Sequence, residues 1–128
     1  MKRDIETRAD IEWLIGNFYK KVKTDPVIGY IFTDVAKVNW EKHLPVMFDF
    51  WENTLFYTGT YSGNPIISHK HLHQIFPLNT DHFKRWIFLF TTNVDELFVG
   101  EKAELAKQRA SSIATVMQVK IIQNNDFE

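Results

Sequence analysis

The side chains with the clearest capacity for chemistry lie in the Pro-flanked segment 64–73, Asn-Pro-Ile-Ile-Ser-His-Lys-His-Leu-His. It contains His69, His71 and His73, in a chain without cysteine. In a helix, His69 and His73 share a face and His71 points away, so the three histidines cannot all bind one ligand. Neutral imidazole is a common side-chain ligand of metals in proteins. The segment therefore predicts a site for a metal-bearing ligand.

Three more polar rings, those of Tyr19, His43 and Trp86, fall on the apolar faces of predicted helices. A buried phenol hydroxyl or indole N–H needs a hydrogen-bond partner, so Tyr19 and Trp86 could offer donors inside a pocket. Alternatively, Tyr19 reaches a backbone carbonyl or water, and Trp86 fills the core. His43 has three open roles, as a satisfied core residue, a gate to solvent or a direct ligand of a metal.

The helices that must position these residues follow from the spacing of apolar side chains. Helical periodicity covers residues 11–22, 40–55, 83–98 and 103–121. The chain has no convincing strand pattern and no internal repeat. We therefore predict an all-α fold with one domain over residues 1–128, a core at about 8–122 and a polar tail at 123–128.

Capping signals mark where these helices begin and end. Thr7 and Asp10 form a capping-box-like start for the first helix. Asp25 precedes a short turn that carries apolar residues inward, and Asn79 precedes the third long helix. Gly100 is expected to close that helix as its C′ residue.

The composition describes one ordinary domain and excludes several classes of function. The chain has 128 residues, of which 45% are hydrophobic, enough for a single substantial core. Fifteen basic and sixteen acidic residues leave no charge excess for binding nucleic acid or an anionic membrane. The absence of cysteine excludes disulfides and thiolate-ligated metals. With no signal-peptide or membrane-span pattern, we expect a cytoplasmic protein.

Four stretches of the chain, within residues 8–122, resemble the truncated haemoglobins and in particular their third group. They are Asn17–Val22, Ile28–Phe32, Trp40–His43 followed by Phe50–Trp51, and His69-x-x-Leu72 leading to His82–Trp86. The chain lacks the Gly-Gly pairs of many truncated haemoglobins, which fits the third group better. The resemblance implies a shortened globin whose helices pack two-over-two around a non-covalent haem b.

The resemblance also implies a role for each candidate residue. His69 corresponds to the proximal iron ligand, with His73 as the reserve candidate, and Phe32 to the aromatic residue packed on the porphyrin. Tyr19, His43 and Trp86 correspond to the distal side. The haem propionates could pair with Lys42, Lys70 or Arg85, among which the spacing does not choose.

These expectations allow three functions of different class. The first is reversible binding of O₂ and other diatomic ligands, CO and NO, by a monomeric haem protein. The second is a haem enzyme, either a nitric oxide dioxygenase or a peroxidase-like protein. It would need a separate reductase, because the chain has no G-x-G-x-x-G motif for a flavin or nicotinamide. The third is a haem-free helical interaction domain whose aromatic residues only fill the core.

Overall fold

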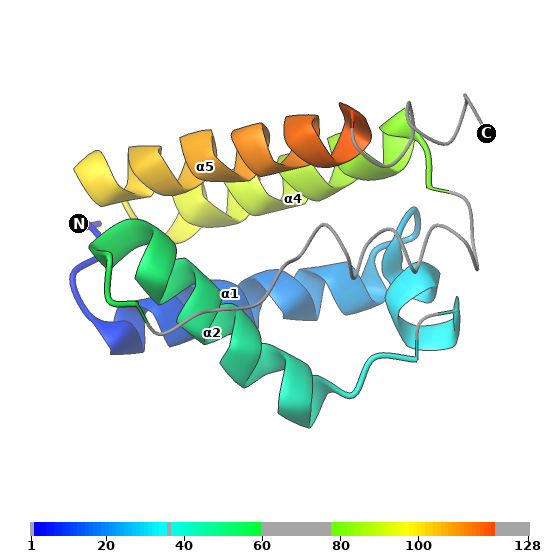
Figure 1. The fold of residues 1–128 in the computed structure, drawn as a ribbon, viewed down its shortest axis with the longest axis horizontal. Helices are drawn as coiled ribbons and strands as arrows, with labels where there is room; N and C mark the ends of the chain where they lie inside the picture. Colours follow the sequence, from blue (N-terminus) through cyan, green and yellow to red (C-terminus); the bar gives the residue numbers. More distant parts are fainter. Residues whose placement is uncertain (1, 36, 60–77, 120–128) are drawn as a thin grey trace.

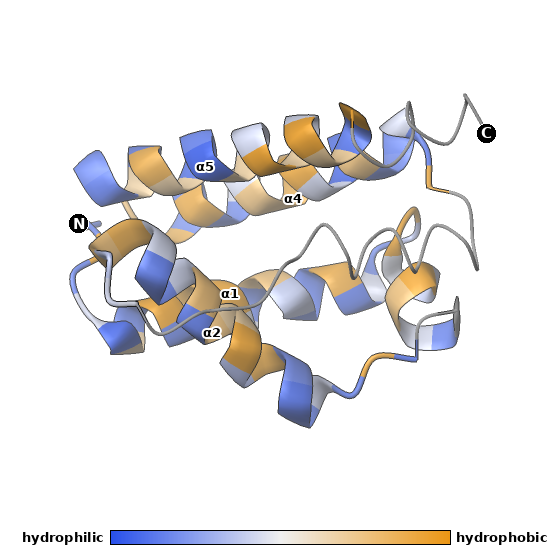
Figure 2. Cartoon of the chain, viewed as in Figure 1, coloured by the Kyte–Doolittle hydropathy of each residue, from blue (hydrophilic) through white to orange (hydrophobic). Residues whose placement is uncertain are grey.

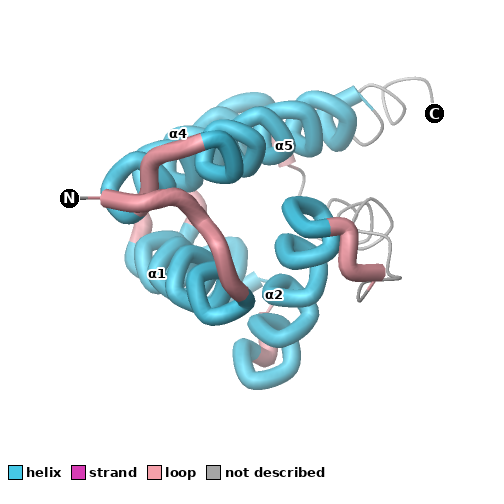
Figure 3. Tube along the Cα trace, turned by 90° about the vertical axis from the view of Figure 1, so that its left-hand side faces the viewer, coloured by secondary structure: helices cyan, strands magenta, loops and turns pink. Residues whose placement is uncertain are grey.

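The computed structural model describes residues 2–35, 37–59 and 78–119. Its elements are the helices α1 (Arg8–Thr24), α2 (Trp40–Phe56), α4 (Thr80–Leu97) and α5 (Glu101–Met117), with a π-helical turn η1 (Ile31–Val35) between the first two. These described residues form helices and loops and contain no strand (Figure 3). The predicted all-α fold class is confirmed.

The helices form two layers. Helices α4 and α5 lie side by side in one layer, and α1 and α2 cross in the other (Figure 1). Between the layers, α1 contacts α4 and α2 contacts α5. This is the predicted two-over-two arrangement. None of the described helices is long and apolar enough to cross a membrane.

The first and third long helices begin with reciprocal capping boxes. The Asp10 backbone N–H donates to Thr7 Oγ1 over 3.2 Å, and the Thr7 N–H donates to Asp10 Oδ2 over 3.1 Å. At the start of α4, the His82 N–H donates to Asn79 Oδ1, and the Asn79 N–H donates to His82 Nδ1, both over 3.1 Å. Each box satisfies backbone donors that the first helical turn leaves without intrahelical acceptors.

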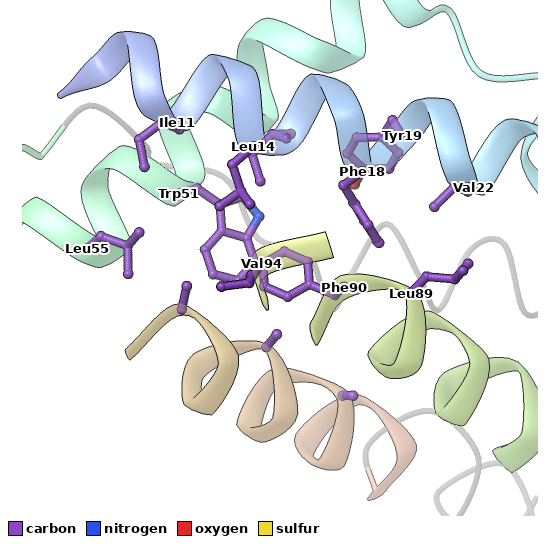
Figure 4. Packing of buried hydrophobic residues seen from close by; sticks show 14 of the residues in the cluster. Ile11, Leu14, Phe18, Tyr19, Val22, Trp51, Leu55, Leu89, Phe90 and Val94 are labelled. Atoms are coloured by element: carbon purple, nitrogen blue, oxygen red, sulfur yellow. The ribbon is translucent and has the colours of Figure 1, made fainter. Parts of the chain in front are cut away.

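The core lies between the two layers. Each helix carries both hydrophilic and hydrophobic residues, as Figure 2 shows. The Trp51 ring of α2 stacks on the Phe90 ring of α4 at a centroid distance of 4.7 Å, and both pack near the apolar residues of α1 (Figure 4). Small buried residues on α5 allow its close approach to α4. They are Ala103, Ala106, Ala110 and Ala114.

Gly100 differs from its predicted role. Helix α4 ends with Phe98 as C-cap, and Gly100 is instead the N-cap residue of α5, with φ at 141°. Because Gly has no side-chain acceptor, Asp4 caps α5 from the N-terminal segment. Its two carboxylate oxygens accept the N–H groups of Lys102 and Ala103, each over 2.8 Å. The Asp4 side chain occupies the space where a Cβ of residue 100 would stand.

Gly100→Ala is therefore expected to destabilise the protein by about 2 kcal/mol, because alanine strains this backbone and displaces the Asp4 cap. Chemical unfolding followed by circular dichroism measures the difference. The matched variant Asp4→Ala removes the cap, together with the hydrogen bond from the Ile5 N–H, without adding a side chain at residue 100, and should cost about 1 kcal/mol. Equal losses of unfolding free energy in Gly100→Ala and Asp4→Ala would contradict the prediction that a side chain at residue 100 adds strain beyond the loss of the cap.

Candidate functional site

A cavity of about 240 Å³ lies between the helix layers. This volume is many times the space that one water molecule needs, so the cavity has the size of a ligand site rather than a packing defect. Its lining is mostly apolar and aromatic. The described lining residues are Tyr19, Ile28, Ile31, Phe32, His43, Val46, Met47, Phe50, Trp51, Leu78, His82, Phe83, Trp86, Ile113, Ala114 and Met117.

Four of the residues singled out from the sequence line this one cavity. Tyr19 comes from α1, Phe32 from η1, His43 from α2 and Trp86 from α4. Each of four elements thus contributes one candidate residue. Tyr19 and Trp86 are 67 residues apart in the chain, and both line this cavity.

The phenol of Tyr19 is deeply buried in the cavity wall, with 5% of the residue's surface exposed. Burial raises the pKa of its phenol, since the charged phenolate is disfavoured away from water. The hydroxyl therefore stays protonated at neutral pH and can act as a hydrogen-bond donor. The Phe18 ring lies 4.9 Å from the Tyr19 ring and fixes one side of it.

His43 and Phe32 contact Tyr19 from two other elements. The His43 ring meets the Tyr19 ring edge-on at 5.4 Å, and its Nε2 atom is buried. The Phe32 ring lies 6.4 Å from Tyr19, also edge-on. These contacts place an imidazole, a phenol and a flat apolar ring side by side in the cavity wall.

Trp86 is held by two aromatic neighbours. Its ring stacks on Phe90 at 5.5 Å and meets the edge of Phe18 at 5.7 Å. Phe18 therefore contacts both Tyr19 and Trp86 and sets their relative positions. The indole is half-buried at the cavity wall, where its N–H is a further hydrogen-bond donor.

His82 is a lining residue that the sequence interpretation missed. Its Nδ1 accepts the Asn79 N–H in the α4 capping box, a place usually taken by Glu or Gln. Burial lowers the pKa of His82, an effect that Asp81 opposes, so the imidazole is neutral at neutral pH. With Nδ1 as an acceptor, the proton lies on Nε2, which makes His82 a poor metal ligand in this geometry.

Four other predicted residues lie outside the part of the chain that the structure describes: His69, Lys70, His71 and His73. Of the other two candidates for binding propionates, Lys42 is exposed on α2, whereas Arg85 is engaged within the protein.

Arg85 on α4 binds Asp25, the residue that follows α1. Its Nε and Nη2 atoms donate to Asp25 Oδ1 over 2.9 and 2.6 Å. The other carboxylate oxygen of Asp25 accepts the N–H groups of Val27 and Ile28, over 2.9 and 3.0 Å, which confirms its predicted capping role. Because Ile28 lines the cavity, this ion pair joins the cavity wall to α4.

Asp25→Asn is expected to reduce the free energy of unfolding by about 1.5 kcal/mol at pH 7, because the bonds from Arg85 lose their charge assistance. Burial disfavours the Asp25 carboxylate, but its hydrogen bonds outweigh burial and lower its pKa. A folded-state pKa below the ordinary value stabilises the protein above about pH 4, and this stability is lost as the pH falls further. The difference between the two proteins should therefore shrink at pH 3.

Denaturant unfolding at pH 7 and pH 3 measures both values. Asp34→Asn, an exposed change in η1, is the matched control and should leave stability unchanged at either pH. A deficit of Asp25→Asn that is equally large at both pH values would contradict the charge-based explanation.

The lining fits a flat, largely apolar ligand. Among the described residues around the cavity, none is Asp, Glu, Lys or Arg. The described part of the chain also holds no group of three His, Asp or Glu residues that could bind a bare metal ion. A porphyrin supplies four metal donors itself and requires one axial donor from the protein. The apolar walls, aromatic rings and few polar atoms fit haem.

Comparison with known proteins gives a consistent result. Residues 4–122 match the family described as bacterial-like globin. The chain is 29% identical over 121 residues to the group 3 truncated haemoglobin of Campylobacter jejuni, covering 92% of this chain and 93% of that protein.

Comparison of the fold with solved structures also finds a truncated haemoglobin. The structure is similar to the crystal structure of the group III truncated haemoglobin from Campylobacter jejuni, with a TM-score of 0.81 and 27% identity. The similarity covers 94% of this chain and 95% of the other. The helical arrangement, the cavity and the match over residues 4–122 lead to one conclusion: the chain belongs to the bacterial-like globin family.

Proposed function

We propose that the chain is a haem b protein that binds O₂ reversibly, with CO and NO as further diatomic ligands. The observation that carries this proposal is the convergence of Tyr19, His43 and Trp86 on one largely apolar cavity. Membership of the globin family supports the haem-binding part, since globins are haem proteins that bind small gases.

The phenol of Tyr19 is the principal donor in this proposal. It is buried and protonated, and a hydrogen bond in a dry cavity is electrostatically stronger than one in water. The indole N–H of Trp86 is a second donor from the opposite layer. Together they would stabilise a ligand that carries partial negative charge and would slow its release.

The remaining roles follow from the chemistry of each residue. Phe32 would pack its ring on the porphyrin, and His43 would control access to the Tyr19 side or bind as a second axial donor. His69 would supply the proximal imidazole. When bound, haem provides an iron with one position open to a diatomic ligand. The surrounding apolar residues would exclude water from that position.

Haem titration of the purified chain tests this function. Trp51 and Trp86 line the cavity, whereas Trp13 is 53% exposed on α1 and is not a lining residue. Haem bound in the cavity should quench tryptophan fluorescence, with an endpoint at one haem per chain. Trp13→Phe should leave that endpoint unchanged. Quenching that rises without saturation would contradict a specific haem site.

A further inference from the structure

Trp40 contacts residues of the cavity wall but is not among the described lining residues itself. It is the first residue of α2, is half-buried and packs against the core. Its ring stacks on Phe32 at 6.2 Å and lies 5.3 Å from the Tyr19 ring and 5.7 Å from the His43 ring. Trp40 thus contacts three of the four candidate residues at once. It can affect the cavity only through them.

A lysine covers this ring. Lys23, in the last turn of α1, places its Nζ atom 4.6 Å from the centre of the Trp40 ring. A cation within about 6 Å of an indole face is attracted by the negative charge density of the ring. Because Lys23 and Trp40 belong to different helices, this contact joins the end of α1 to the start of α2.

The backbone beneath Lys23 is fixed by close packing. Gly29 lies directly against the last turn of α1, and a Cβ there would stand 2.9 Å from the carbonyl oxygen of Lys23. The Gly29 N–H donates to the carbonyl of Asp25 over 3.0 Å. Asp25 is in turn bound to Arg85 of α4. The ammonium group of Lys23 therefore extends from a rigid base.

We propose that Lys23 and Trp40 form a clamp that positions Tyr19 and His43 in the cavity wall and holds the start of α2 against the end of α1. The clamp is defined by these two side chains. Opening it would release Trp40 from Phe32 and allow the start of α2, which carries His43, to move away from α1. Trp40 is a positioning residue, since it acts through the rings it contacts. This inference rests on the proposed function where ligand entry is concerned.

Lys23→Met tests the clamp, because it keeps a long apolar side chain and removes the cation. Lys23→Arg is the matched control, since a guanidinium also binds over an indole ring. The first measurement is amide hydrogen exchange in the haem-free chain at Lys42 and His43, whose N–H groups donate to the Asn39 carbonyl. Exchange should be about fivefold faster in Lys23→Met and unchanged in Lys23→Arg.

The second measurement is the rate of CO association with the haem-loaded protein, expected to rise about fivefold in Lys23→Met and to return to the original rate in Lys23→Arg. Trp40→Leu removes the ring itself, so it should also increase both the amide exchange rate and the rate of CO association. Exchange in Lys23→Met that equals exchange in the unaltered chain would overturn the proposal, as would equal behaviour of the Met and Arg variants. If the chain does not bind haem, the proposed function fails, while the exchange measurement still decides whether the clamp exists.

Discussion

His69→Ala is expected to abolish stable haem retention. The proposed proximal imidazole is the protein's direct bond to the iron on that side, and the described lining of the cavity is mostly apolar, with His43 and His82 as its other imidazoles. The variant protein, mixed with one equivalent of haem and passed through a desalting column, should lose the absorption of bound haem. Added imidazole should restore a histidine-like ferrous spectrum, because it supplies the same donor atom.

The neighbouring histidines provide the controls for this experiment. His71→Ala should retain haem, since in a helix His71 would not share a face with His69. His73→Ala tests the reserve candidate and should also retain haem. A His69→Ala protein with an unchanged ferrous spectrum, together with haem loss in His73→Ala, would show that the proximal residue is His73.

Tyr19→Phe is expected to keep haem and accelerate O₂ release by about tenfold to hundredfold. The substitution removes one hydroxyl from a site with 5% exposure and leaves the ring contacts with Phe18 and His43 in place. A hydrogen bond to a partly charged partner contributes about 1.5–3 kcal/mol, which corresponds to this change in rate. Stopped-flow displacement of O₂ by CO measures the dissociation rate.

The matched control is Tyr30→Phe, which removes a hydroxyl from a tyrosine that is 41% exposed. It should leave O₂ release unchanged. If Tyr19→Phe released O₂ at the original rate, the donor would have to be another group, and Trp86→Phe would be the next variant to test.

Much of the fold could be predicted because its signals are local. The capping box at Thr7 and the apolar residues spaced three and four apart determine α1, and Asn79 marks the start of α4. The family resemblance brought Tyr19, Phe32, His43 and Trp86 together before their positions were known. All four line the cavity, and their individual roles stay predictions.

Other features depend on tertiary contacts that no local pattern encodes. Gly100 was predicted to end α4, but Asp4 approaches from the N-terminal segment and makes Gly100 the start of α5. His82 was not predicted as a cavity residue, because an N3 histidine in a capping box has no distinctive sequence signal. Arg85 was a candidate for binding propionates, and its pairing with Asp25 spans 60 residues.

The cavity wall supplied by α5 was also beyond prediction. Ala114 and Met117 continue the apolar spacing of that helix and are indistinguishable in sequence from ordinary core residues. Only the crossing of α5 with α2 brings them to the cavity. Helix periodicity predicts which face is buried, whereas the partner that buries it depends on how the layers pack.

The central claim is that this chain holds haem through a histidine and binds a diatomic ligand in the cavity beside Tyr19 and Trp86. Absorption spectra of the haem-loaded protein, first ferric, then reduced, then under CO, test it most directly. We expect a Soret band that shifts on CO binding in the manner of histidine-ligated ferrous haem. A chain that retains no haem at stoichiometric loading, or a reduced spectrum that CO does not change, would contradict the claim.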